Sequence, residues 1–135
     1  MSGVQTGRFV IRNAQLEAIE QGTERELHQE IVSHLRLTNT EGVKKLDDQE
    51  LERRVRIGVK RARERGMIAP GVLTLYCSLL IDISPTFDSY EPVAKLLAET
   101  ERSADENMLL LSERMTAEQW VEVKNAADPV YWESV

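Results

Sequence analysis

The chain has 135 residues, a length that predicts one compact domain and disfavours a two-domain enzyme with a cleft between its domains. Apolar residues make up 41% and charged residues 30%, which excludes a disordered tail, and the few Gly, Pro and aromatic residues disfavour a turn-dense β fold. The net charge of −6 argues against a protein that binds nucleic acid over its whole surface. We therefore expect an all-α protein, a compact single-domain bundle of five to six helices with a central apolar helix.

The N-terminal part predicts a leader followed by a long helix. Residues 1–8 are polar and contain glycine, so we expect a flexible leader before a single helical domain over residues 9–128. Asn13 can cap a first helix that runs to about Leu37, because apolar residues recur there at three- and four-residue steps. The polar residues 38–45 predict a loop.

Two further helices are predicted in the middle of the chain. Asp47 or Asp48 can cap the second, and Gly66 can end it in the left-handed conformation. Pro70 suits the first turn of the third helix, which covers residues 72–83 and is apolar around most of its circumference. We place this third helix at the centre of the bundle. Its polar residues share one strip that faces solvent, a partner or a hydrogen-bond network: Thr74, Ser78 and Asp82.

The C-terminal third predicts three short helices and an aromatic tail. A loop over residues 84–89 should place Phe87 in the core, and Pro92 should open a fourth helix. Ser103 and Thr116 have the spacing of capping boxes and predict two more helices. Residues 129–135 form a separate C-terminal tail with an aromatic pair.

The residues that most often carry catalysis or bind metals have structural explanations. His28 and His34 lie six residues apart on one helix, about 240° apart around its axis, so they cannot share a metal; a glutamate four residues before each predicts an intrahelical pair. Cys77 lies among leucines and predicts a buried thiol. Asp82 and Asp88 could form an acid and base pair in a small hydrolase, but a structural role for Asp88, in a turn or with an arginine, is favoured. We predict no enzyme activity, metal or cofactor.

Charge is unevenly distributed along the chain. Residues 44–65 contain nine basic and five acidic residues, whereas residues 82–135 contain four basic and twelve acidic ones. Three interpretations stay open: arginines paired within the domain, a face that docks an acidic protein surface, and a nucleic-acid site, which the lack of interleaved aromatics disfavours. The docking hypothesis rests on four residues that share one helix face: Arg53, Arg56, Lys60 and Arg63.

A surplus of apolar side chains near the C-terminus suggests a second partner-binding set. Residues 108–111 are four consecutive large apolar residues, which cannot all face one core from a peripheral helix. The aromatic pair of the tail can lie over the core or insert into another chain. The candidate anchors are Met108, Leu110, Leu111, Tyr131 and Trp132.

Several short segments together resemble a family of small helical bacterial proteins whose genes lie in type VI secretion loci, beside spike, PAAR-tip and toxic effector genes. The segments are FVIRNAQ at 9–15, HLR at 34–36, VRIGV at 55–59, ARERG at 62–66, SPTFD at 84–88 and PVAKLL at 92–97. Two positions depart from the family pattern, since Arg65 replaces an aromatic and Thr86 replaces a residue that is commonly acidic.

The resemblance implies a non-enzymatic accessory protein, an adaptor or co-chaperone that binds an effector or its loading machinery. An immunity protein that neutralises a cognate effector toxin is the alternative. Cytoplasmic localisation is expected, because the chain shows no signal-peptide core and no run of about 20 apolar residues, and its single cysteine cannot form an internal disulfide. The expected partner is a protein, membrane and nucleic-acid binding are not expected, and self-association stays open.

Overall fold

The computed structural model describes residues 23–135, and every regular element in that range is helical. The prediction of an all-α fold is confirmed. The proposed leader, the Asn13 cap and the segment at 9–15 lie outside the described residues. None of the helices within 23–135 is both long and apolar enough to cross a bilayer.

The elements follow one another with short connections. A first helix occupies residues 23–38 of the described range and is called the 23–38 helix below. The remaining elements, in chain order, are α2 (Glu41–Lys44), α3 (Asp48–Glu64), α4 (Pro70–Asp82), η1 (Phe87–Ser89), α5 (Glu91–Leu97), α6 (Ala104–Leu109), α7 (Leu111–Arg114), α8 (Ala117–Asn125) and η2 (Tyr131–Glu133).

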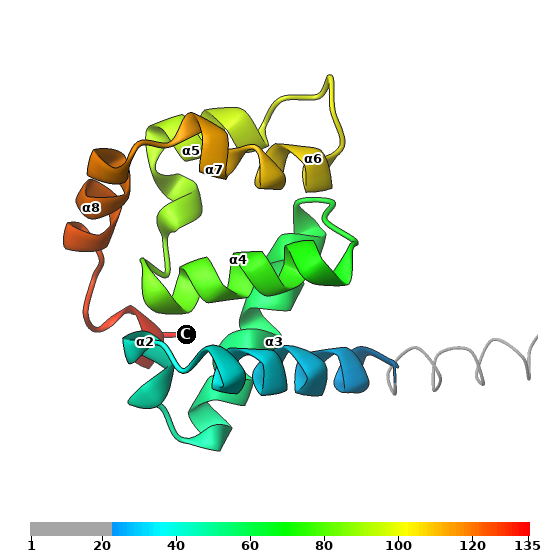
Figure 1. The fold of residues 1–135 in the computed structure, drawn as a ribbon, viewed down its shortest axis with the longest axis vertical. Coiled ribbons are helices and arrows are strands. Elements are labelled where there is room, and N and C mark those ends of the chain that lie inside the picture. The colour runs from blue at the N-terminus through cyan, green and yellow to red at the C-terminus, as the bar shows by residue number, and fades with distance from the viewer. Residues whose placement is uncertain (1–22) are drawn as a thin grey trace, which may run out of the picture.

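The apolar helix α4 lies in the middle of the fold, as predicted. The 23–38 helix lies on one side of it and α5, α6 and α7 lie on the other, while α3 crosses behind it and α8 leads the chain back toward α3 (Figure 1). Four α4 side chains have no exposed surface: Leu73, Tyr76, Cys77 and Leu80. They belong to one hydrophobic cluster that extends from Ile31 to Trp132, so both ends of the described chain share a core.

Helix ends are where local sequence signals proved most reliable. The Asp47 side chain accepts from the backbone N–H of Glu50 and so begins α3. Ser103 and Thr116 form complete capping boxes at the starts of α6 and α8. Gly66 has a φ of 92°, the left-handed conformation that glycine adopts without steric cost.

Two local features differ from the prediction. The expected loop at 38–45 contains the one-turn helix α2, because Val43 is drawn completely into the core there. The expected fifth helix is two short helices, α6 and α7, that meet at Leu110. Both α2 and α7 are too short to produce a recognisable apolar period in the sequence.

The C-terminal tail is attached to the domain. Trp132 is 7% exposed and lies beneath the guanidinium of Arg54, which sits 4.8 Å from its ring centroid. Arg53 donates to the backbone oxygens of Trp132 and Val135, at 2.5 and 2.9 Å. The tail therefore closes over α3 and completes the core instead of extending from it.

Candidate functional site

The predicted docking stripe on α3 is divided by its contacts. Arg53 is engaged with the tail and with Glu50, and Arg63 donates two 2.8 Å hydrogen bonds to the carboxylate of Glu24. Arg56 is 57% exposed at its side chain and lies 3.7 Å from Glu52, a weak surface pair, and Lys60 is exposed. Two of the four predicted residues are thus used to hold the fold together, and Arg56 and Lys60 face outward.

Arg61 and Arg65, the other basic residues near the end of α3, both bind a buried carboxylate. Their guanidinium groups donate to the two carboxylate oxygens of Asp88, at 2.7 and 3.1 Å. The hydroxyl of Tyr76 donates to the same carboxylate at 2.5 Å, and Asp88 is only 2% exposed. Burial and the Asp88 contact together raise the pKa of Tyr76. The predicted bond between Asp88 and an arginine is confirmed, and the site is a fully satisfied structural network.

The other candidate catalytic groups also have structural partners. Cys77 is completely buried, and burial raises the pKa of its thiol to about 12, so it carries almost no thiolate at neutral pH. Asp82, at the end of α4, accepts a 2.6 Å hydrogen bond from the hydroxyl of Thr40. Asp88 lies on another element, η1. The hypothesised pairing of Asp82 with Asp88 as acid and base finds no shared hydrogen bond among the described residues.

The two histidines lie in different surroundings. Partial burial is the main cause that lowers the pKa of His28, and its predicted partner Glu24 is taken by Arg63. His34 is exposed on the other side of the 23–38 helix. Across residues 23–135 no group of three or more His, Cys, Asp or Glu side chains converges as a metal site.

The predicted apolar anchors mostly lie in the core, which corrects the expectation that they form a surface. Met108 and Leu111 are 0% and 1% exposed, because residues 108, 111 and 115 recur at helical steps on one inward face. Trp132 is 7% exposed, because the tail packs on α3. Leu110 and Tyr131 are half-buried. The large apolar side chains that are exposed within the described chain are Leu37, Ile68, Leu109, Val121, Val130 and Val135.

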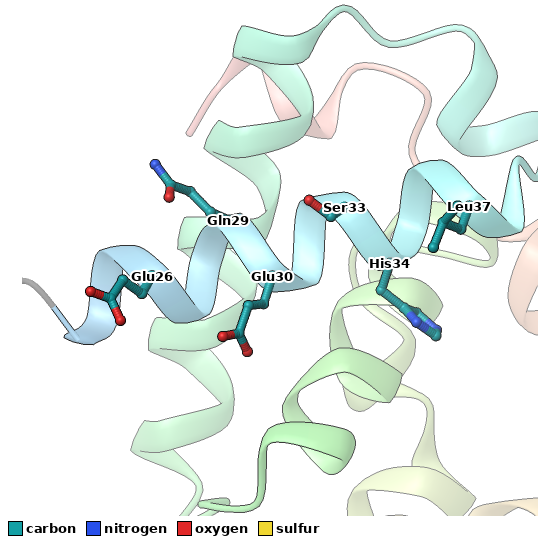
Figure 2. Close-up of a pocket in the computed structure, with 6 residues that line it drawn as sticks. All are labelled: Glu26, Gln29, Glu30, Ser33, His34 and Leu37. Carbon is teal, nitrogen blue, oxygen red and sulfur yellow. The ribbon is translucent and has the colours of Figure 1, made fainter.

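A groove runs along the 23–38 helix, and α4 forms its other wall over part of its length. Three adjoining hollows, of about 450, 440 and 310 Å³, all include His34. We call their union the His34 groove. Figure 2 shows Glu30 and His34 projecting from the side of the helix that faces α4, with Leu37 one turn further along.

The groove has an apolar floor and a polar rim. Its floor contains Leu27, Ile31, Leu35 and Leu75, and its α4 wall carries the small residues Gly71, Thr74 and Ser78. The hydroxyls of Thr74 and Ser78 donate to backbone carbonyls of their own helix. Their hydrogen-bond donors are thus already used, and these small side chains make the α4 wall only weakly polar. The strip predicted on α4 therefore faces this groove.

Apart from His34, the ionisable side chains that line the groove among the described residues are all carboxylic acids. Glu26, Glu30 and Asp82 contribute carboxylates, and no lysine or arginine of the described chain lines any of the three hollows. This contrasts with α3, where arginines meet carboxylates at close range.

Sequence reasoning found the α4 wall but missed the rest of the groove. Leu37 is 84% exposed, and it lies two positions after the buried Leu35, on the opposite side of the helix. An apolar residue outside the apolar period of the helix could have indicated exposed apolar surface at this position. Nothing in the sequence indicated that His34 and Glu30 face the polar strip of α4, because these residues are about forty positions apart.

Comparison with family models, with curated proteins and with solved structures finds no match to this chain.

Proposed function

We propose that this protein acts by binding another protein, as an accessory of type VI secretion that engages an effector or its loading machinery in the cytoplasm. The observation that carries the binding role is the His34 groove, an open groove with a mixed apolar and polar lining and the 84% exposed Leu37 at its edge. Exposed apolar surface beside a polar rim is characteristic of protein-interaction sites. The type VI context rests on the resemblance of the short segments described above.

Several resemblance segments have structural roles, which explains why they do not identify a binding residue. Asp88 of SPTFD holds Arg65 of ARERG. Gly58 of VRIGV lies against Cys77, and Arg36 of HLR donates to the carbonyl of Val43. We therefore seek the partner-binding residues outside these segments, with the exception of His34, which belongs to HLR and lines the groove.

The test is affinity purification of the tagged protein from its native host, with mass spectrometry of the retained proteins. A retained component encoded in the same type VI locus supports the proposal. Two double variants localise the interface: Leu37→Ser with Thr74→Arg at the groove, and Arg56→Glu with Lys60→Glu on the outward face of α3. We expect the groove variant to lose the component and the α3 variant to keep it.

The opposite pattern, loss only in the α3 variant, would move the interface to the basic face that the sequence predicted. Retention of no locus-encoded protein by the wild-type chain would contradict the proposed function. All four altered side chains are exposed or half-exposed, so both variants should fold, and circular dichroism checks this directly.

The second candidate function is that of an immunity protein, which the same resemblance implies. Deletion separates the two roles. Loss of an adaptor lowers the abundance or secretion of its effector without harming the producing cell. Loss of an immunity protein poisons the cell, and co-expression with the toxin restores growth.

A further inference from the structure

We infer that the His34 groove binds a basic amphipathic helix of the partner protein, an inference that rests on the proposed binding function. The groove follows the 23–38 helix from Glu26 to Thr38. At 1.5 Å per residue this path is about 18 Å, or three helical turns. That length suits one short helix of a partner better than a small molecule or a broad flat surface.

The apolar residues of the groove favour a partner helix that has an apolar face. Leu27 and Leu75 are partly exposed in the groove, and Leu37 is 84% exposed at its edge, whereas Ile31 and Leu35 beneath them are 1% exposed and belong to the core. The wall residues Gly71, Thr74 and Ser78 are small, so a helix backbone can approach α4 closely at this place. A helix with apolar residues at three- and four-residue steps can fill such a channel.

The rim selects basic residues on either side of that apolar face. Glu26 and Glu30 stand one turn apart on one rim, and Asp82 lies at the far end. No ion pair neutralises Glu26, Glu30 or Asp82 within residues 23–135. A bound helix with lysine or arginine beside its apolar face would supply the missing counter-charges and gain orientation and association rate.

A second copy of this chain fits the groove less well. The outward basic residues of α3, Arg56 and Lys60, flank Ile57, whose side chain is packed against the core. That face offers basic charge without an exposed apolar ridge to enter the floor. Self-association through the groove is therefore the competing outcome that the experiment must detect.

The experiment measures binding of synthetic peptides to the full-length protein by fluorescence anisotropy. The probe is an amphipathic peptide of about 18 residues, long enough to form a helix, with leucines at three- and four-residue steps and flanking lysines. The comparison peptide keeps the leucines and replaces every lysine with glutamate. We expect the lysine peptide to bind, the glutamate peptide to bind at least about tenfold more weakly, and added salt to weaken the lysine peptide.

A charge-reversal variant and a matched control assign the binding to the groove. Glu26→Lys with Glu30→Lys changes two exposed rim residues, and Glu113→Lys with Glu118→Lys makes the same change in net charge on α7 and α8. The groove variant should bind the lysine peptide at least about tenfold more weakly, because like charges are then opposed at close range. The control should bind as the wild type does.

Equal binding of the two peptides, or equal absence of binding, would overturn the inference. So would equal weakening by both variants, or a chain that dimerises in sedimentation analysis and loses this self-association in the groove variant. The outcomes separate this inference from the proposed function. If a locus-encoded partner is still retained by the Glu26→Lys, Glu30→Lys protein, then the binding role holds and the basic-helix inference fails.

Discussion

The carboxylate of Asp88 lies 2.7 Å from the guanidinium of Arg61, joining η1 to α3 across 27 positions of sequence. Arg65 and the hydroxyl of Tyr76 complete the contacts of that carboxylate. Because Asp88 is 2% exposed, its charge is stabilised by these three donors in place of water. The loop between α4 and α5 is thereby tied to the centre of the fold.

Replacement of Asp88 by Asn should destabilise the protein by about 3 kcal/mol, because it leaves the partly buried Arg61 without a counter-charge. Urea unfolding followed by circular dichroism measures the change. Tyr76→Phe, which removes one hydrogen bond to the carboxylate and no charge, should cost less, about 2 kcal/mol. A loss below about 1 kcal/mol for Asp88→Asn would show that water solvates this carboxylate in the folded protein.

Glu50 should make stability depend on pH in the acid range. The hydrogen bond from Arg53 is the main cause that lowers the pKa of Glu50 from 4.5 to about 2, and Arg54 adds to it. A lowered folded-state pKa contributes stability that is complete above the unfolded value of 4.5 and is lost as pH falls toward 2. Since the pair is partly exposed, the contribution should be at most about 1 kcal/mol.

The measurement is the difference in unfolding free energy between wild type and Glu50→Gln, taken in steps from about pH 6 to about pH 3. This difference should shrink as the pH falls. A Glu50→Gln difference that does not change with pH would contradict the assigned hydrogen bonds.

The contact between α3 and α4 depends on Gly58. A Cβ at this position would lie 2.7 Å from the sulfur of Cys77 and 3.1 Å from Leu80 Cδ1. Gly58→Ala should therefore cost about 1 to 3 kcal/mol through overpacking. The double variant Gly58→Ala, Cys77→Ala should lose less stability than the sum of the two single changes, because the second removes the atom that clashes.

Gly71→Ala is the control for Gly58→Ala, because it adds the same methyl group at a position with free space. A Cβ at Gly71 would meet no atom within 4 Å, and the residue lies in the first turn of α4. This change should stabilise the fold by about 0.4 to 1 kcal/mol by restricting the unfolded chain.

Urea unfolding of the Gly58→Ala, Cys77→Ala and double variants tests the packing of α3 on α4. If the two single changes have additive effects, the two helices separate to accept the methyl group, which contradicts the expected result.

Cys77 should be unreactive in the folded protein. It is the single cysteine of the chain, it has no exposed surface, and its pKa is raised to about 12 by burial. A disulfide reagent such as DTNB at pH 8 should label it only at the rate at which the protein opens, and rapidly in denaturing urea. Rapid stoichiometric labelling without denaturant would place the thiol at the surface and contradict the packing of α4.

Local signals in the sequence were enough to predict the helices and several of their ends. Asp47, Ser103 and Thr116 each bond a backbone N–H three residues away, so the cap and its target occur together in the sequence. The same holds for the apolar circumference of α4, which predicted a central helix. The four-residue helices α2 and α7 were missed, since one turn contains too few residues to show a period.

Tertiary structure decided which charged residues hold the fold and which remain available to a partner. Arg53 and Arg56 look equivalent on one helix face, but Arg53 reaches the backbone of Val135, 82 positions away, while Arg56 stays at the surface. The groove arises in the same way, because Glu30 meets the wall of α4 only after the chain has folded back. Residue type and spacing determined the helices through interactions within a few positions; the pairing of distant side chains depends on how those helices pack, and no local pattern records it.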